Sequence, residues 1–291
     1  MGEIKVNAPI RVNLEARCNT DDGTIRKNCK MSRRYQRVVY PGAAETYCYE
    51  PCAVVGGSPN IINALHVLRQ WKGDIFAIND TAGYLSAQGI PHYLLAIDCD
   101  PNPWKIGPLT KGAVFASRVH RNQMKQFKRA QVRIFNMAED GDAIDRGVEG
   151  GPTAVCRTPH LLLRMGYQAV YYFGIDSCFY NETHITGTYK TAHANMMIIR
   201  VKDVDYLSNA ALLLQVQHMV DVFRKYPQFL KCASGGLMRA MLEHPDDWSV
   251  VAITEDLKGQ YQRGDQNPWQ KVYTPGEKPI WQPPAMQMGG A

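Results

Sequence analysis

From Cys52 onward, short apolar runs alternate with segments of helical periodicity. The apolar runs are bounded by Gly, Asn, Asp or Pro, and they predict strands at residues 53–55, 74–78, 93–97, 113–115, 132–135, 169–173 and 229–232. The periodic segments predict helices over residues 59–71, 82–88, 118–129, 153–165, 206–225 and 237–242, with a long connection over residues 175–205. Strands that alternate with helices of this length indicate βαβ units. Residues 52–258 are therefore expected to form an α/β, Rossmann-like domain with an open, mostly parallel sheet flanked by helices.

The two ends of the chain do not share this pattern. Residues 1–51 are polar and basic without sustained periodicity, and they predict an irregular N-terminal arm. Residues 259–291 are rich in Pro and Gln and predict an extended tail, which cannot form a packed core of its own. We therefore expect a homo-oligomer or a larger protein assembly in which a neighbouring subunit holds the tail.

The composition is that of an ordinary globular protein, with 45% hydrophobic and 21% charged residues. No apolar run approaches the roughly 20 residues that span a bilayer, and the first residues lack the apolar core of a signal peptide. A cytoplasmic protein without a membrane partner is expected. The eight cysteines form no paired C-x-x-C sets, which favours reduced thiols over a structural zinc site built from Cys18, Cys29, Cys48 and Cys52.

Positive charge is concentrated in two parts of the chain, whose formal net charge is +6. Residues 1–40 hold nine basic and four acidic side chains, and residues 101–133 hold eight basic side chains and no acidic one. In the second block, helical spacing predicts one basic stripe of Arg118, Arg121, Lys125, Lys128 and Arg129. Such a stripe is a solvated face or attracts a nucleotide, a nucleic acid or an acidic partner. Nucleic acid is the least favoured, because no aromatic residues are interleaved with the stripe.

The first predicted strand runs into the turn Gly56-Gly57-Ser58-Pro59-Asn60. Ser58 suits the N-cap of the following helix and Pro59 its first position. We therefore expect unpaired backbone N–H groups around residues 58–61, which would favour a bound phosphate together with the helix dipole. The alternative is an ordinary turn between a strand and a helix that needs two glycines for its geometry.

Polar side chains also follow the later strands, and ligands of open parallel sheets bind beyond the carboxyl ends of the strands. The second strand is followed by Asn79 and Asp80, and the third by Asp98 and Asp100. We expect Asn79, Asp80 and Asp98 to position the ribose or base of a nucleotide. If the protein depends on Mg²⁺, Asp98 and Asp100 are the candidate ligands. Each of these residues alone also suits a helix cap or a turn.

A second glycine turn, Gly150-Gly151, opens the helix predicted at 153–165 and is expected to face the same crevice. The strand at 169–173 leads to Asp176, and His184 follows in the long connection. A histidine with a pKa near neutrality suits a general base. His184 is the first candidate, His193 the second, and Asp176 is grouped with them as catalytic.

The order of these motifs resembles that of the MptE-like family. The motifs lie at residues 54–61, 78–80, 95–98, 150–151, 163–167, 172–176 and 183–184, with a closing turn at 231–236. This family groups archaeal 6-hydroxymethylpterin diphosphokinases with the Maf flagellin-modifying proteins, and it is distantly similar to bacterial sialyltransferases that use a CMP-sugar. The resemblance covers about residues 52–240. This chain departs from the family's Gly-x-Gly-Pro-Ser turn, since Ser58 replaces the second glycine and Asn60 the serine.

The resemblance implies a nucleotide-dependent transferase. The first expectation is transfer of a nonulosonic-type sugar from a CMP donor to a hydroxyl acceptor, with His184 or His193 as base and with phosphate held by Gly56, Gly57, Ser58 and Asn60. One alternative is transfer of pyrophosphate from ATP to a pterin-like alcohol, which needs Mg²⁺. The other is a non-catalytic assembly protein that keeps the fold, because a fold alone does not fix a function.

Overall fold

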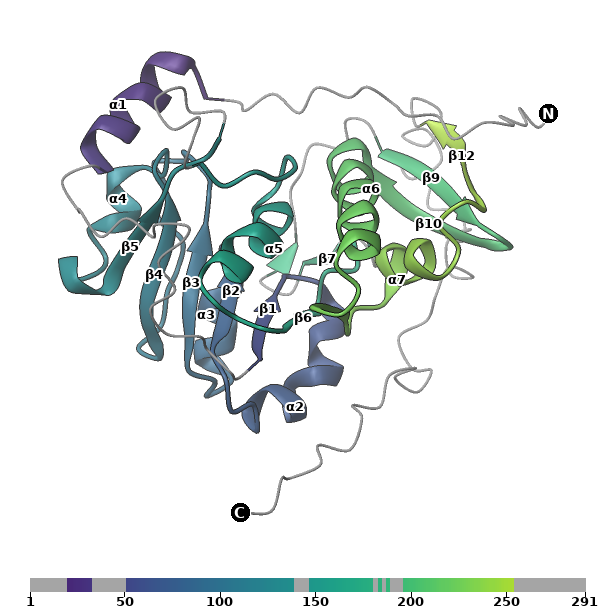
Figure 1. Cartoon of the computed structure of the whole chain (residues 1–291), viewed down its shortest axis with the longest axis horizontal. Helices are drawn as coiled ribbons and strands as arrows, with labels where there is room; N and C mark the ends of the chain where they lie inside the picture. The colour runs from purple at the N-terminus through teal and green to yellow at the C-terminus, as the bar shows by residue number, and fades with distance from the viewer. Residues whose placement is uncertain are drawn as a thin grey trace.

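The computed structural model describes residues 20–32, 51–138, 147–179, 183–184, 187–188 and 196–253 (Figure 1). His193, most of the arm and the tail at 259–291 lie outside the described residues, as do the side chains of the two short strands β7 (Thr183–His184) and β8 (Gly187–Thr188). Within the described residues, no helix has the length and apolar character needed to cross a membrane.

The centre of the fold is a seven-stranded sheet in which every neighbouring pair of strands is parallel. Its order is β11-β6-β1-β2-β3-β4-β5. The strands are β1 (Cys52–Val55), β2 (Ile75–Ile78), β3 (His92–Ala96), β4 (Thr110–Ala116), β5 (Val132–Phe135), β6 (Val170–Phe173) and β11 (Leu230–Cys232). The chain runs from β1 to β5 in one direction and then returns to place β6 against the free side of β1. The predicted Rossmann-like fold is confirmed, and its topological switch point lies between β1 and β6.

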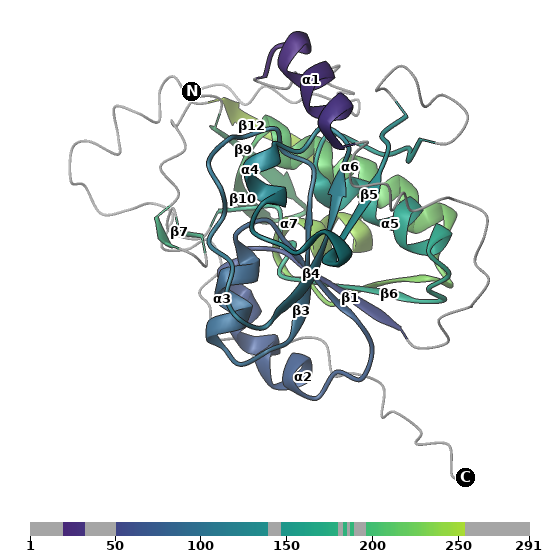
Figure 2. The same cartoon turned by 90° about the vertical axis from the view of Figure 1, so that its left-hand side faces the viewer.

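Helices cover both faces of this sheet (Figures 1 and 2). They are η2 (Pro59–Ala64), α2 (Leu65–Arg69), α3 (Thr81–Ala87), α4 (Arg121–Met124), η3 (Arg129–Gln131), α5 (Ala154–Arg164), α6 (Ala210–Lys225) and α7 (Gly236–Glu243). Every residue of β1 and of β2 is buried. This agrees with their continuous apolar sequence, because a strand of a parallel sheet contacts helices on both sides.

The predicted basic helix at 118–129 is wrong. The chain forms only the single turn of α4, then extends at Lys128 before η3. Gln123 explains the irregular path, because its side chain is buried and bound to the loop after β3: Nε2 donates to the Asn102 carbonyl (2.7 Å), and Oε1 accepts from the Trp104 N–H (3.1 Å). The five basic residues therefore do not share one helix face. The predicted helix at 59–71 is likewise divided, into η2 and α2.

The basic arm contains a helix that the sequence pattern did not predict, α1 (Asp22–Ser32). Asp21 starts it, since its carboxylate accepts a hydrogen bond from the Thr24 N–H (2.9 Å). The helix packs beside α4, where Asn28 Nδ2 donates to the Arg118 carbonyl (3.0 Å) (Figure 2). The expectation of an irregular arm is therefore wrong for residues 22–32.

A second, antiparallel sheet lies beside α6 and α7, where a long connection was expected (Figure 1). Its strands are β9 (Met196–Val201), β10 (Val204–Asn209) and β12 (Trp248–Ile253), in the order β10-β9-β12. The prediction that α6 begins at residue 206 is wrong. Asn209 ends β10 and caps α6, with its side-chain oxygen accepting from the Leu212 N–H (2.9 Å), so the helix cannot begin earlier.

His92 in β3 makes the stability of the fold depend on pH. Its side chain is fully buried, with Nδ1 2.8 Å from the Ile90 carbonyl and Nε2 3.0 Å from the Thr110 hydroxyl. A carbonyl only accepts, so Nδ1 carries a proton. Burial lowers the pKa of His92, an effect that the bond to Ile90 opposes and the charge of Lys111 reinforces.

We therefore expect the fold to lose stability as the pH falls below about 6.5, the pKa of histidine in an unfolded chain. Below that pH the unfolded chain binds more protons than the folded one, which favours unfolding. Urea unfolding at pH 5 and pH 7 measures the difference, and it should be smaller in His92→Gln. An equal pH dependence in the variant and the parent would contradict this role for His92.

Candidate functional site

Asp176, which follows β6, joins three strand ends at the switch point. It is 1% exposed, and its Oδ2 accepts hydrogen bonds from Ser58 Oγ (2.8 Å) and Asn60 Nδ2 (2.7 Å). Its Oδ1 accepts from the backbone N–H of Gly235, which precedes α7 (3.0 Å). One buried carboxylate thus ties the turn after β1 and the start of α7 to the end of β6. These bonds give Asp176 a positioning role, and its catalytic role stays a prediction.

The turn after β1 does not offer the free N–H groups that the sequence predicted. The Ser58 N–H donates to the Gly174 carbonyl (3.0 Å), the Asn60 N–H to Ser58 Oγ (3.3 Å) and the Ile61 N–H to the Ser58 carbonyl (3.1 Å). The prediction of unpaired donors is therefore wrong for these three residues. Asp176 also places a negative charge against Ser58 and Asn60, which disfavours a phosphate at the same point.

Gly57 is different from the rest of this turn, because its N–H has no hydrogen-bond partner within the described part of the chain. The register between β1 and β2 pairs Val55 with Ala77, so the turn that holds Gly57 and the turn that holds Asn79 follow neighbouring strand ends.

Asn79 and Thr81, after β2, carry buried polar atoms without partners. Asn79 Nδ2 donates to Asp98 Oδ2 (3.1 Å), whereas Asn79 Oδ1 is buried and has no hydrogen-bond partner among the described residues. The same holds for Thr81 Oγ1, whose residue is 1% exposed. Asn79 also has a φ of 51°, in the left-handed region. Buried polar atoms without partners are rare, and each is a position that a bound molecule or a water would satisfy.

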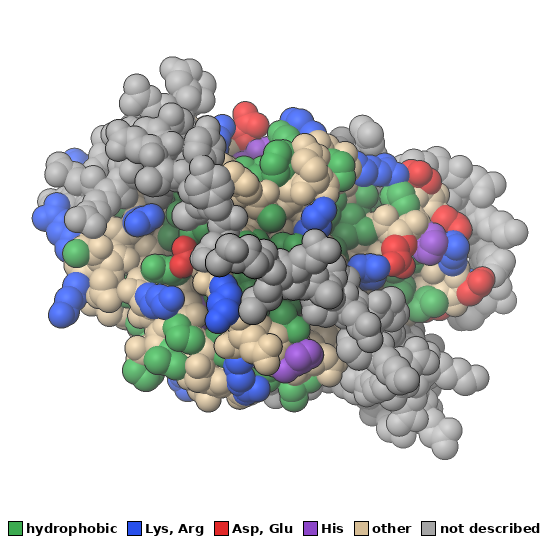
Figure 3. Space-filling view, turned by 60° about the horizontal axis from the view of Figure 1, so that its bottom comes forward, with side chains coloured by type: hydrophobic (Ala, Val, Ile, Leu, Met, Phe, Trp, Pro, Cys, Tyr) green, Lys and Arg blue, Asp and Glu red, His purple; other side chains and the backbone are tan. Residues whose placement is uncertain are grey.

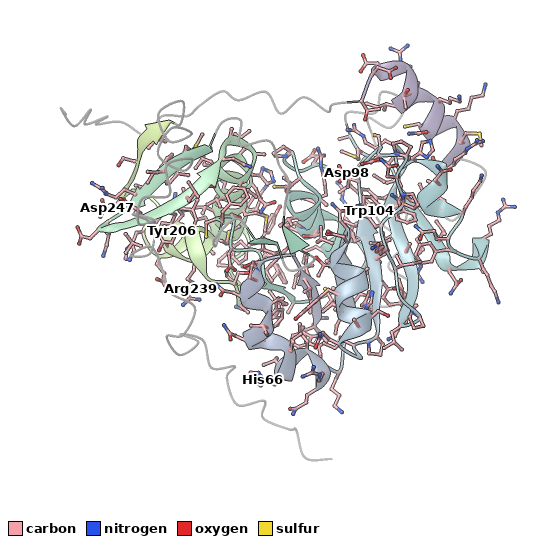
Figure 4. All side chains as sticks on the ribbon, turned by 180° about the vertical axis from the view of Figure 1, so that it is seen from behind. His66, Asp98, Trp104, Tyr206, Arg239 and Asp247 are labelled. Carbon is pink, nitrogen blue, oxygen red and sulfur yellow. The ribbon has the colours of Figure 1, made fainter. Side chains whose placement is uncertain are left out.

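Asp98 lies on the exposed side of this group, after β3, at the end of the sheet nearest α1 (Figure 4). Desolvation by the surrounding protein raises the pKa of Asp98, and nearby Asp100 raises it further, while the hydrogen bond from Asn79 and the charge of Arg118 lower it. The carboxylate gains from a hydrogen-bond donor or a cation in this position. The structure thus brings together Asn79 and Asp98, as the sequence predicted.

Asp80 and Asp100 lie close to this group in the sequence. Asp80 occupies the N-cap position of α3, although its side chain does not cap that helix. Asp100 Oδ1 accepts from the Asn102 N–H (2.7 Å), the bond of a local turn. Within the described ranges, no group of three His, Cys, Asp or Glu side chains is arranged to hold a metal ion. Mg²⁺ often takes only one or two carboxylates beside substrate phosphates, and Asp98 is the carboxylate that fits this use.

Gly150 and Gly151 stand at the start of α5 but face side chains of the protein. A Cβ on Gly151 would lie 2.8 Å from the ring of His218 and 3.0 Å from Cys156 Sγ. From this end of α5 a chain of hydrogen bonds leads to the loop after β6: Thr153 Oγ1 donates to Gln215 Oε1 (2.7 Å), and Gln215 Nε2 to Ser177 Oγ (2.9 Å). Gly151 allows close packing against α6, whereas Gly150 lies against residues of α5 itself. The role of both glycines in cofactor binding stays a prediction.

The predicted bases are not located by the structure. His184 belongs to β7, but its side chain lies outside the described residues, as does all of His193. Lys27 and His120 belong to none of the sequence motifs, yet the fold brings them to the same edge of the sheet as Asp98. Their signal in the sequence was the positive charge of the two basic blocks, which become neighbours only through the packing of α1 on α4.

Comparison with known proteins adds no match: no family model, no curated protein and no solved structure is significantly similar to this chain.

Proposed function

We propose that this chain is a nucleotide-dependent transferase that transfers a nonulosonic-type sugar from a CMP donor to a hydroxyl acceptor. The observation that carries the proposal is the unpaired, buried Oδ1 of Asn79 beside the carboxylate of Asp98, at the carboxyl ends of β2 and β3. Ligands of open parallel sheets bind at this edge. The resemblance of residues 52–240 to the MptE-like family supports the same assignment.

The polar atoms at this edge suit the nucleoside part of the donor. Asn79 Oδ1 and the Asp98 carboxylate accept hydrogen bonds, and ribose hydroxyls or a base amino group donate them. The N–H of Gly57 and the hydroxyl of Thr81 add donors to a site that otherwise only accepts. In this proposal the four residues orient the nucleotide and exclude water from its buried side.

The transfer itself breaks the bond between the anomeric carbon of the sugar and a phosphate oxygen, so that CMP leaves with that electron pair. A new bond forms between the anomeric carbon and the acceptor oxygen, whose proton passes to a general base. His184, or His193 in its place, is the proposed base. Its neutral form is needed to accept the proton, so activity should fall as the histidine becomes protonated.

A nucleotide panel tests this proposal. We expect CMP to raise the melting temperature of the protein without Mg²⁺, and to do so more than AMP, UMP or GMP. Asn79→Ala and Asp98→Asn should each weaken CMP binding about tenfold or more by calorimetry. The first removes a buried acceptor, and the second replaces a charged acceptor with a neutral amide. Asp205→Asn, which changes a carboxylate in a surface ion pair beyond the site, is the matched control. Failure of every nucleotide to bind would contradict the proposal.

A second candidate is a non-catalytic assembly protein that keeps the fold. The observation that favours it is Asp176, whose carboxylate already satisfies Ser58, Asn60 and Gly235 in place of a bound anion. For such a protein, no nucleotide should stabilise the fold, and His184→Ala should leave its function intact.

The same panel includes ATP with Mg²⁺, and stabilisation by that pair alone would favour a pyrophosphokinase acting on a pterin-like alcohol, with Asp98 near the metal.

We also propose that the protein acts in the cytoplasm and forms a homo-oligomer or a larger assembly through its tail. The composition of residues 259–291 supports the assembly, since a segment rich in Pro and Gln is not expected to form a core of its own. Light scattering of the full chain and of a variant ending at residue 258 tests the assembly. A monomeric full chain would contradict it.

A further inference from the structure

Basic side chains from two distant parts of the sequence meet around His120. Lys27 comes from α1, whereas Arg121 and Lys125 lie at and just after α4. All three charges affect the pKa of the same imidazole, that of His120. Burial is the largest cause that lowers this pKa, the charge of Arg121 is the next, and the charges of Lys125 and Lys27 lower it further. We call Lys27, His120, Arg121 and Lys125 the basic cluster. Within the described part of the chain, its three cations make no ion pair.

The basic cluster is held in place by hydrogen bonds that do not use its charged groups. On one side, Asn28 Nδ2 donates to the Arg118 carbonyl (3.0 Å), which fixes α1 against the end of β4. On the other, Asn122 Nδ2 donates to the Pro101 carbonyl (3.0 Å) and Gln123 Nε2 to the Asn102 carbonyl (2.7 Å). The second pair joins α4 to the loop that follows Asp98. The cluster therefore stands next to the proposed nucleoside site.

His120 has a fixed role in this arrangement. Its Nδ1 accepts from the Asn122 N–H (3.2 Å), so in the neutral ring the proton is on Nε2, which leaves a donor. The nearby carboxylate of Asp100 raises the pKa of His120 and is the acidic group that offsets the three cations there. The three positive charges repel one another, and Asp100 offsets them only in part because its carboxylate also accepts from the Asn102 N–H. A bound anion would reduce this repulsion.

On the face that Figure 3 shows, charged side chains are unevenly distributed. Figure 3 shows acidic side chains mainly toward the end of the molecule that carries α7 and β12. Lys and Arg dominate toward the opposite end, which carries β4 and β5.

We propose that the phosphate of the nucleotide binds at the basic cluster, and not in the glycine turn after β1. This inference rests on the proposed nucleotide site. Two independent observations support the placement. The turn after β1 disfavours an anion, since Asp176 holds its side-chain donors and the protein's own carbonyl and hydroxyl oxygens hold three of its N–H groups, which leaves only that of Gly57. The cluster, in contrast, offers cations and the His120 Nε2–H beside Asp98.

The test compares cytidine, CMP and inorganic pyrophosphate by calorimetry on the full chain. In Lys27→Gln/Arg121→Gln, we expect CMP and pyrophosphate to bind at least about fivefold more weakly than in the parent, because two charge-assisted contacts are lost. Cytidine should bind both proteins equally. Lys72→Gln/Lys111→Gln is the matched control: it removes the same charge from exposed positions at the opposite, amino edge of the sheet. Circular dichroism checks that both variants are folded.

A second readout follows His120 itself by proton NMR, with His120→Asn used to assign its signal. Pyrophosphate or CMP should raise the pKa of His120, because a bound phosphate favours the imidazolium. CMP binding that is unchanged in the double variant, together with an unchanged His120 titration, would contradict the placement of the phosphate. If neither cytidine nor CMP binds the parent protein, the nucleotide site itself is contradicted.

Discussion

Asp176→Ala is expected to lower the free energy of unfolding by about 3–5 kcal/mol. The substitution leaves three partly buried donors without an acceptor: Ser58 Oγ, Asn60 Nδ2 and the Gly235 N–H. It also removes the group that joins β1, β6 and α7. Asp176→Asn keeps one acceptor oxygen and should lose roughly half as much. Urea unfolding followed by circular dichroism measures both.

The control for this prediction is Asp205→Ala. Asp205 pairs with Arg200 (2.7 Å) in a partly exposed ion pair on β9 and β10, and loss of such a pair costs at most about 1 kcal/mol. The positioning role of Asp176 is contradicted if the two alanine variants lose equal stability. It is also contradicted if Asp176→Ala stays as stable as the parent while CMP transfer is abolished, since that pattern belongs to a catalytic carboxylate.

Gly174→Ala is expected to cost about 2–4 kcal/mol, the second large effect on stability. Gly174 has a φ of 62°, and a Cβ there would lie 2.8 Å from the Gly56 carbonyl oxygen and 3.3 Å from the Cβ of Ile61. The approach is mutual, because a Cβ on Gly56 would lie 2.6 Å from the Gly174 carbonyl oxygen. The two glycines let the ends of β1 and β6 meet at the switch point.

Gly89→Ala is the control that separates two causes of lost stability, the steric clash of a new Cβ and the cost of a positive φ. Gly89 has a φ of 75°, but a Cβ there would have nothing within 4 Å. Its substitution should lower the free energy of unfolding by only about 1 kcal/mol, because alanine is less stable than glycine in the left-handed region. Equal losses in Gly174→Ala and Gly89→Ala would show that the close approach of the two turns contributes nothing to stability.

The parallel sheet could be predicted from the sequence because its strands are buried on both faces. Cys52–Val55 and Ile75–Ile78 are continuous apolar runs between Gly, Asp and Asn, and that pattern leaves few other structures open. The second sheet was missed for the opposite reason. β10 runs directly into α6 at Asn209, so the apolar positions of the strand extend the helical periodicity that follows.

The site was predicted in part. Asn79 and Asp98 follow adjacent strands, and parallel topology alone brings such residues together. The hydrogen bonds of Ser58 could not be anticipated, since they depend on Asp176, which is 118 residues away along the chain. The same limit applies to the basic cluster, because nothing local in the sequence places Lys27 beside Arg121.

The most direct test of this account is a crystal structure of the full chain with CMP. We predict that the ribose or base lies within hydrogen-bond distance of Asn79 and Asp98, that the phosphate lies toward Lys27 and Arg121, and that Asp176 keeps its bonds to Ser58 and Asn60. Phosphate density against Gly57 and Ser58 with Asp176 displaced, or CMP bound away from the carboxyl ends of β2 and β3, would contradict it.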